Sequence, residues 1–140
     1  MKLVVDTGRI IAALLRDNIS RKILFNENFN FICPDHTISE IDEHKEEIIG
    51  KSGISEDEFS ILLAIIFERI DVISKLSYEA FLNEAKNLIN DLEDVPFLAL
   101  CLAIKSEGIW TEDKHFEKQN RVKIFKTKDI IKYLENTNKT

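Results

Sequence analysis

The sequence lacks the features of several large classes of protein. Only two cysteines occur, Cys33 and Cys101, and neither belongs to a paired-cysteine motif of the kind that binds zinc or performs redox chemistry. Each lies inside an apolar run, so we expect buried free thiols in a reducing cytosol. No apolar run approaches the roughly 20 residues that span a bilayer, and Asp6 and Arg9 interrupt the apolar stretch where a secretory signal would lie. We therefore expect a soluble, cytoplasmic protein with no membrane partner.

An excess of positive charge is also missing. The 25 acidic residues outnumber the 19 basic ones, which gives a formal net charge of -6. A protein that holds nucleic acid by charge alone has the opposite balance. A phosphate-bearing partner would therefore need help from metal ions or from a local basic patch.

Internal repeats, low-complexity tracts and linkers are absent as well, and the length favours one domain. A chain of 140 residues with 44% apolar content can bury one substantial core but would struggle to build two. We expect a single domain over residues 1–135 and a loose polar tail over residues 136–140.

What the sequence does contain is an alternation of short apolar runs with helical patterns. Five runs read as strands, at residues 2–5, 29–33, 71–73, 108–111 and 122–125. Alternation of this kind is typical of an α/β fold in which helices cover a parallel sheet.

Three segments have helical patterns. Ser55 and Glu58 match a capping box, ahead of apolar side chains at positions 59, 62, 63, 66, 67 and 70. A second apolar stripe occupies positions 78, 81, 82, 85, 88 and 89. Residues 95–104 are apolar nearly all round, which predicts a buried helix.

Four acidic residues, Asp6, Glu40, Asp94 and Asp113, fall where a strand is expected to end or a helix to begin. In an open parallel sheet the C-terminal ends of the strands share one crevice, so these carboxylates can converge there. Converging carboxylates repel one another unless cations lie among them, and hard oxygen ligands suit Mg²⁺ or Mn²⁺. The sequence therefore predicts a divalent metal site.

Each of these acids also has a structural alternative. Asp6, Asp94 and Asp113 precede expected helices, where an aspartate can accept backbone N–H bonds and complement the helix dipole. Glu40 stands three residues after Thr37, so it could complete a capping box with that residue. The caps would be independent of one another, whereas metal chemistry needs all four acids on one side of the sheet.

Four short motifs resemble the PIN-domain ribonucleases over nearly the whole chain. They are Val4-Val5-Asp6-Thr7, Ser39-Glu40-Ile41, Asp94-Val95-Pro96-Phe97-Leu98-Ala99-Leu100 and Ile109-Trp110-Thr111-Glu112-Asp113. The resemblance implies a three-layer α/β/α fold with a central parallel sheet, and an acidic crevice that binds Mg²⁺ or Mn²⁺ and hydrolyses RNA. Many such domains are toxins of toxin-antitoxin pairs, so RNA, an antitoxin protein and a second copy of the chain are the candidate partners.

The resemblance also assigns roles to the four acids. Asp6 and Asp94 would be the main metal ligands, Asp113 a ligand directly or through water, and Glu40 a ligand or a positioner of the attacking water. A bound ion could lower the pKa of a water to make a hydroxide nucleophile, while one or two ions neutralise charge on the scissile phosphodiester. Asp6, Glu40, Asp94 and Asp113 are thus the predicted catalytic and metal-binding residues.

Other residues near these motifs have less specific signals. Thr111 could hydrogen-bond a metal-bound water, and Arg9 and Lys114 could contact phosphate. His44 and Asp91 each lie about one turn from a predicted site residue and could add a ligand. For all five, a structural or solvated position is the competing interpretation.

One position departs from the family pattern. Many members carry Asn or Ser two residues after the first aspartate, whereas this chain has Gly8, which offers no side-chain ligand. A water could take that place, metal affinity could be weaker, or activity could be lost. Two alternatives to a ribonuclease therefore stay open: a catalytically weak PIN-like binding or scaffold module, and another metal-dependent phosphoesterase or a DNA nuclease.

Overall fold

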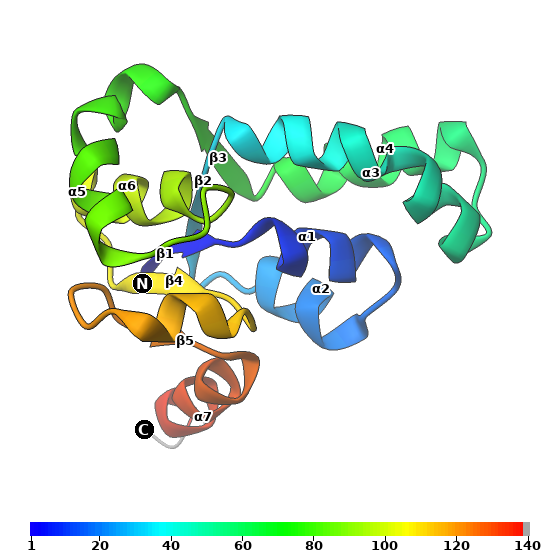
Figure 1. Cartoon of the computed structure of the whole chain (residues 1–140). Coiled ribbons are helices and arrows are strands. Elements are labelled where there is room, and N and C mark those ends of the chain that lie inside the picture. Colours follow the sequence, from blue (N-terminus) through cyan, green and yellow to red (C-terminus); the bar gives the residue numbers. More distant parts are fainter. Residues whose placement is uncertain (139–140) are drawn as a thin grey trace.

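Five parallel strands form the centre of the protein, of which the computed structural model describes residues 1–138. The strands lie in the order β3-β2-β1-β4-β5 (Figure 1). Their bounds are Lys2–Val5 for β1, Asn30–Pro34 for β2, Ile70–Ile73 for β3, Gly108–Trp110 for β4 and Ile124–Phe125 for β5. Every pair of neighbours is parallel, with Val4 of β1 opposite Ile32 and Ile109 in its two partners. All five expected strands are confirmed, with small shifts at their ends.

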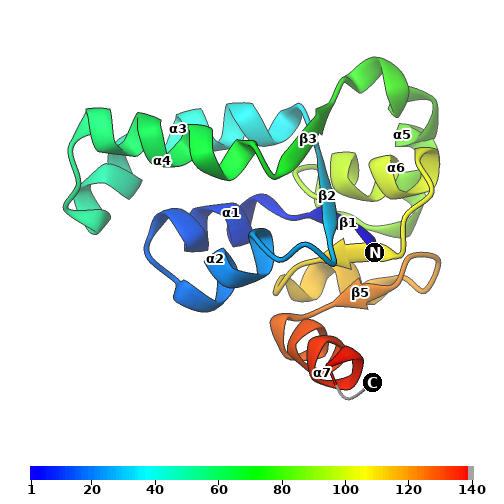
Figure 2. The same cartoon turned by 180° about the vertical axis from the view of Figure 1, so that it is seen from behind.

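Helices cover both faces of this sheet and give the expected three-layer α/β/α architecture (Figures 1 and 2). One face carries α1 (Thr7–Leu14), α2 (Asn18–Leu24), α3 (His36–Ser52), α4 (Glu56–Phe67) and α7 (Thr127–Thr137). The other carries α5 (Leu82–Leu88), α6 (Val95–Ala103) and the 3₁₀ helix η3 (Lys114–Lys118). Two more 3₁₀ turns, η1 (Lys75–Ser77) and η2 (Glu79–Phe81), precede α5.

Strand β1 shows why the apolar runs are nearly continuous. Leu3 and Val5 pack into the core on one face, whereas Val4 packs into the core on the other, and all three are fully buried. Side chains alternate between the two faces of a strand, so a central parallel strand needs apolar residues at every position. This packing fixes β1, with Asp6 directly after it, at the middle of the sheet.

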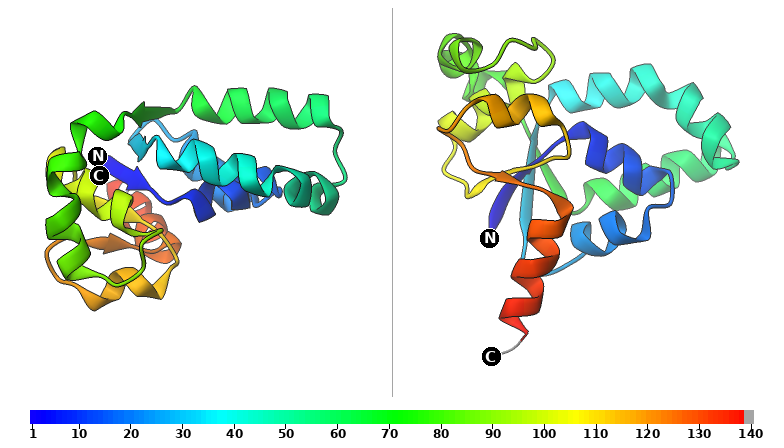
Figure 3. Two further views of the ribbon diagram at one scale, coloured as in Figure 1. Left: turned by 45° about the horizontal axis from the view of Figure 1, so that its top comes forward. Right: turned by 60° about the horizontal axis from the view of Figure 1, so that its bottom comes forward.

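Two expected helices are confirmed. Ser55 Oγ accepts a 3.1 Å hydrogen bond from Glu58 N while Ser55 N donates to Glu58 Oε1 at 3.2 Å, so the capping box begins α4 as predicted. Helix α6 carries five buried residues between Val95 and Leu100, which agrees with its nearly uniform apolar character. Figure 3 shows α3 running away from the sheet and α4 returning toward it, and α7 following β5, the strand at one edge of the sheet.

Three expectations about element boundaries need correction. Helix α4 ends at Phe67, and Ile70 begins β3 because Arg69 donates hydrogen bonds to three carbonyl groups of residues 24–29, which fixes the chain at the sheet edge. Of the apolar stripe at residues 78–89, only Leu82–Leu88 form an α-helix, α5. Tyr78 lies outside this helix, where its hydroxyl donates a 2.6 Å hydrogen bond to Asp35. Helix α7 extends to Thr137, inside the expected tail, whose last two residues lie outside the described part.

Both cysteines are free, as expected, but only Cys33 is buried. Cys101 is partly exposed because it lies near the end of α6, where the helix reaches the surface. Within residues 1–138, no helix is both long enough and apolar enough to cross a membrane.

Candidate active site

The structure brings all four predicted acids to one hollow of about 430 Å³ at the C-terminal edge of the sheet. Asp6 follows β1, Glu40 lies in α3, Asp94 precedes α6 and Asp113 follows β4. Seven of the twelve residues that line this acidic hollow are Asp or Glu, and Asp91, Glu93 and Glu112 complete the seven. Arg9 is the one Lys or Arg among the twelve, so the hollow has a strongly negative charge.

Asp6 is held by a threonine from the neighbouring strand. Its Oδ2 accepts a 2.6 Å hydrogen bond from the hydroxyl of buried Thr111, while its backbone N–H donates to Trp110 O at 3.1 Å. The carboxylate makes no side-chain capping hydrogen bond to α1, although the backbone N–H of Gly8 lowers the pKa of this carboxyl. Burial raises the pKa of Asp6, and the nearby Asp113 adds to the rise, while the Thr111 hydrogen bond opposes it.

Glu40 is fixed by a threonine in a similar way. Its Oε1 accepts a 2.8 Å hydrogen bond from the hydroxyl of Thr7, which also contacts Thr37 at 3.0 Å. Helix α3 begins at His36, so Glu40 lies too far into the helix to form a capping box with Thr37. Burial raises the pKa of Glu40, and the negative charge of Asp6 works in the same direction.

Asp94 is the most deeply buried of the four acids. Its side chain is 10% exposed, and its Oδ2 has no hydrogen-bond partner within residues 1–138, although it lies 3.4 Å from His115 Nδ1. It makes no capping bond to α6, although it occupies the N-cap position. Burial, followed by repulsion from Asp113, Asp91 and Asp6, raises the pKa of Asp94 to about 7. A buried oxygen in this state has a strong requirement for a cation or a proton.

Asp113 is the acid for which the capping alternative holds. Its Oδ1 accepts a 2.9 Å hydrogen bond from His115 N at the start of η3, and its own N–H donates to Thr111 Oγ1 at 2.9 Å. The hydroxyl of Thr111 therefore links Asp6 and Asp113, which orients two acids from different ends of the chain. Asp113 therefore both caps η3 and lines the acidic hollow.

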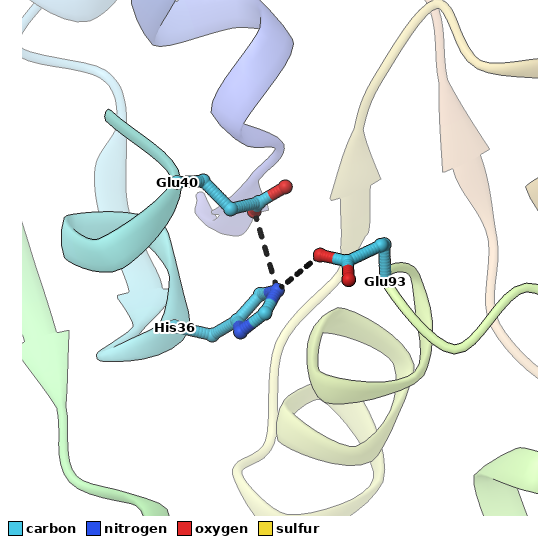
Figure 4. Close-up of side chains that lie close together, drawn as sticks. All are labelled: His36, Glu40 and Glu93. Atoms are coloured by element: carbon cyan, nitrogen blue, oxygen red, sulfur yellow. Dashed lines mark hydrogen bonds and ion pairs between the residues drawn. The ribbon is translucent and has the colours of Figure 1, made fainter. Parts of the chain in front are cut away.

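Several polar residues around the hollow were not singled out from the sequence. His36 Nε2 lies 2.9 Å from Glu93 Oε2 and 3.7 Å from Glu40 Oε1, and the three side chains point toward one another (Figure 4). The spacing of four residues between His36 and Glu40 on α3 was a usable signal, whereas nothing local indicated Glu93. His44, a candidate from the sequence, is half exposed and lies 3.4 Å from Glu47, although it also lines the acidic hollow.

The sequence matches the PIN domain family over residues 4–135, which is most of the chain and includes all four predicted acids. The chain belongs to the PIN domain family. A search among curated proteins finds no match to this PIN domain.

A solved structure supports the same fold. A chain in the crystal structure of VapBC2 from Rickettsia felis, bound to a DNA fragment from their promoter, superposes with a TM-score of 0.65 at 15% sequence identity. The superposition covers 90% of this PIN domain and 98% of that chain. The two proteins therefore share a fold although few of their residues are identical.

Gly8, where the PIN domain departs from the family pattern, has room for a side chain. A Cβ atom built there would lie 3.6 Å from Asp6 Oδ2, which is an ordinary van der Waals distance. Gly53 and Gly108 have positive φ angles, whereas Gly8 does not. Neither space nor backbone conformation therefore requires glycine at this position.

The donor set of the PIN domain fits a divalent cation. Carboxylate oxygens from four separate segments meet in one hollow, and the unpartnered Oδ2 of Asp94 is among the atoms that a cation would satisfy. Arg9 also lines the hollow with a buried Nε that has no hydrogen-bond partner in the described chain. A guanidinium in that state is available to an anionic group such as phosphate.

Proposed function

We propose that this PIN domain is a metal-dependent endoribonuclease that hydrolyses RNA phosphodiester bonds in the acidic hollow. The observation that carries the proposal is the convergence of Asp6, Glu40, Asp94 and Asp113, with one buried carboxylate oxygen left without a partner. Scattered helix caps would not require this convergence. Neither Asp6 nor Asp94 makes a side-chain capping hydrogen bond, and Glu40 does not complete a capping box with Thr37.

Asp6 and Asp94 would be the main ligands of Mg²⁺ or Mn²⁺, with Asp113 as a further ligand directly or through water. When bound, the ion supplies an acidified water and neutralises the charge that develops on the phosphodiester. Thr111 keeps the Asp6 carboxylate in one orientation through its 2.6 Å hydrogen bond. This preorganisation lowers the cost of arranging the ligands around the substrate.

Glu40 would hold the attacking water and take its proton. Its Oε1 is fixed by Thr7 while burial raises the pKa of the carboxyl, and a base with a raised pKa accepts a proton more readily at neutral pH. Arg9, the one Lys or Arg that lines the hollow, would contact the phosphate. These local contacts offset the repulsion of RNA by a chain with a net charge of -6.

The proposal predicts cleavage of single-stranded RNA that requires Mg²⁺ or Mn²⁺ and disappears in chelator. Asp6→Asn and Asp94→Asn should each reduce cleavage by about 100-fold or more, because each removes a ligand whose effect on the transition state is several kcal/mol. Asp71→Asn is the matched control, since Asp71 is an exposed acid on the edge strand β3. Full activity in chelator, or in either site variant, would contradict the assignment.

The substrate panel should also include single-stranded DNA and a small phosphodiester, each with and without Mn²⁺. Preference for either over RNA would favour another metal-dependent phosphoesterase or a DNA nuclease. Absence of all cleavage at saturating Mn²⁺, in a protein that is folded, would favour a binding or scaffold module.

We further propose that an antitoxin protein is the partner of this domain. The fold likeness to the VapBC2 chain supports a toxin-antitoxin role, and an apolar hollow of about 310 Å³ between α3 and α4 offers a docking place. Ile38 lines this hollow, and Ile61 and Ile65 on α4 are exposed at 61% and 42%. A partner that buries these side chains would remove apolar surface from water. A second copy of the chain could instead occupy such a surface.

A further inference from the structure

A second hollow, of about 580 Å³, lies beside the acidic hollow at the C-terminal edge of the sheet. Asp35, which follows β2, and Lys75, which follows β3, line it together with residues of α5 and of the start of α6. The acidic hollow contains the residues that follow β1 and β4. Because β2 lies next to β1, the two hollows are neighbours along the ends of the strands.

The two hollows share a wall, which is formed by the start of α3 and the turn before α6. On α3, His36 lines the second hollow, and Glu40, one turn later, lines the acidic hollow. Before α6, Leu92 lines the second hollow, while Asp91 and Glu93 on either side of it line the acidic hollow. His36 Nε2 lies 2.9 Å from Glu93 Oε2, so this pair joins the two halves of the wall (Figure 4). A chain-like ligand bound in one hollow can therefore continue into the other across this pair.

The charge of the second hollow differs from that of the acidic one. Lys75 and Lys86 line it, and Asp35 is the one acid among the described residues around it. Both oxygens of that carboxylate accept hydrogen bonds, from the Tyr78 hydroxyl at 2.6 Å and from Lys75 N at 2.9 Å. Neither lysine amine has an ion pair or a hydrogen bond within residues 1–138, whereas three other lysines each pair with a glutamate. The two amines are therefore available to an anionic partner.

Apolar and aromatic side chains form much of the remaining surface of the second hollow. The apolar ones include Leu82, Leu92, Val95 and Pro96. The imidazole of His36 is part of the same lining and packs edge-on against Phe97, with ring centroids 6.3 Å apart. Proteins that bind single-stranded nucleic acid combine cationic side chains for the phosphates with apolar or aromatic surfaces for the bases. The second hollow has both.

We propose that the second hollow binds an unpaired nucleotide of the RNA substrate, one that flanks the phosphodiester cleaved in the acidic hollow. This inference rests on the proposed nuclease function. Lys75 and Lys86 contact phosphates of the flanking chain, while the base packs against Leu92 and His36. A base can enter only when it is unpaired, so the hollow selects single-stranded RNA over duplex RNA. The lysines also supply the local basic patch that a chain with a net charge of -6 needs to hold a polyanion.

Binding of RNA to this hollow can be measured apart from cleavage. We would follow the anisotropy of a labelled single-stranded RNA of about ten nucleotides, in chelator and over a series of salt concentrations. The double substitution Lys75→Gln, Lys86→Gln should weaken binding by about ten-fold at low salt. It should also reduce the slope of log K against log salt by about 1.4, because each phosphate contact with a single strand contributes about 0.7. Lys75→Arg, Lys86→Arg should restore both values, since arginine keeps the charge.

A third hollow, of about 470 Å³, provides the matched control. It lies at the opposite edge of the sheet, among residues that precede β1, β4 and β5, and Lys123 and Lys132 line it. Lys123→Gln, Lys132→Gln removes the same charge from the chain and should leave both the affinity and the salt slope close to those of the unmodified protein. Equal losses in the two double variants would show that only net charge matters, and would overturn the proposal.

Cleavage kinetics give a second readout. Loss of contacts to a flanking nucleotide should raise KM for the oligonucleotide with little change in kcat, because these contacts are equally strong in the substrate complex and the transition state. A dinucleotide is too short to occupy both hollows, so the Lys75→Gln, Lys86→Gln variant should cut it as fast as the unmodified protein does. If the unmodified protein cuts no RNA, the nuclease proposal fails, and the salt series still decides whether the second hollow binds RNA.

Three further results would overturn the proposal. They are undiminished RNA affinity in Lys75→Gln, Lys86→Gln, no RNA binding by the unmodified protein, and equal affinity for duplex RNA. Sedimentation tests the rival occupant, a second copy of the chain, because Leu92 is 70% exposed. A dimer that Leu92→Asp dissociates, with RNA binding that the lysine substitutions do not alter, would assign the hollow to that second copy.

Discussion

The surroundings of Asp94 disfavour the ionised form of its carboxyl group. Burial and the neighbouring carboxylates of Asp113, Asp91 and Asp6 raise its pKa to about 7 from an ordinary value of 3.8. In the metal-free protein, the folded state therefore holds a proton at Asp94 that the unfolded state releases near pH 4. Its stability contribution is fully present below about pH 4 and is lost as the pH rises through about 7.

Metal-free Asp94→Asn should consequently be more stable than the unmodified protein at pH 8, and the difference should shrink toward pH 4.5. The expected gain at pH 8 is about 2–4 kcal/mol, because the substitution removes a buried charge without changing the side-chain shape. Denaturant unfolding in chelator at the two pH values measures this difference. Asp71→Asn, in an exposed residue, should show no such change, and equal stability of Asp94→Asn and the unmodified protein at pH 8 would contradict the argument.

At the scale of an element, the start of α1 would determine how many side-chain ligands the proposed metal site has. Gly8 lies in its first turn beside Asp6, with an ordinary backbone conformation and room for a Cβ atom. Gly8→Asn should change the free energy of unfolding by about 0.5 kcal/mol or less, since the two residues differ little in helix propensity. A positive φ at position 8 would have made the cost larger, but Gly8 does not have one.

The functional effect of Gly8→Asn separates two kinds of nuclease. In a weakened enzyme, the new amide oxygen near Asp6 should tighten Mn²⁺ binding or increase cleavage at limiting metal. In a complete enzyme that uses a water there, the change should be neutral or harmful. Mn²⁺ titrations monitored by RNA cleavage distinguish the outcomes, and Gly50→Asn serves as a control because Gly50 lies in α3 with open space around it.

At the scale of the whole molecule, the proposed active site and the proposed partner surface share α3 but use different residues of it: Glu40 and His44 line the acidic hollow, whereas Ile38 and Ile41 line the apolar one. The acidic hollow lies at the strand ends, whereas the apolar hollow lies between α3 and α4, which extend away from the sheet (Figure 3). A substitution in one can therefore leave the other intact. Different substitutions can therefore test the proposed cleavage and the proposed antitoxin binding separately.

If the proposed toxin role holds, expression of the chain alone should arrest growth of the expression host, and co-expression of its antitoxin should relieve the arrest. Asp94→Asn should not be toxic, while Ile38→Asp should remain toxic and escape neutralisation, because it places a charge in the apolar hollow. Leu76→Asp is the control, since Leu76 is 80% exposed and does not line that hollow. RNA cleavage in vitro without growth arrest would indicate a housekeeping enzyme instead of a toxin.

The sequence by itself determined the local elements of this protein. Apolar runs located the five strands, and Ser55 with Glu58 located the start of α4, because strand burial and helix capping depend on neighbours a few residues away. It also placed Asp6 and Asp113 at strand ends, where a parallel sheet collects side chains. The end of α4 at Phe67 was not predictable in this way, because Arg69 is held by carbonyl groups from α2 and the loop before β2.

Only the tertiary structure decided what each site residue contacts. The hydroxyl of Thr111 reaches Asp6 across 105 positions in the sequence, and Thr7 reaches Glu40 across 33, so no local pattern carries either bond. The same holds for the choice between cap and ligand, since Asp113 caps η3 while Asp94 makes no cap at an equivalent helix start. These outcomes depend on the order of strands in the sheet, which brings β4 beside β1 and with it the carboxylates, the threonine and His115.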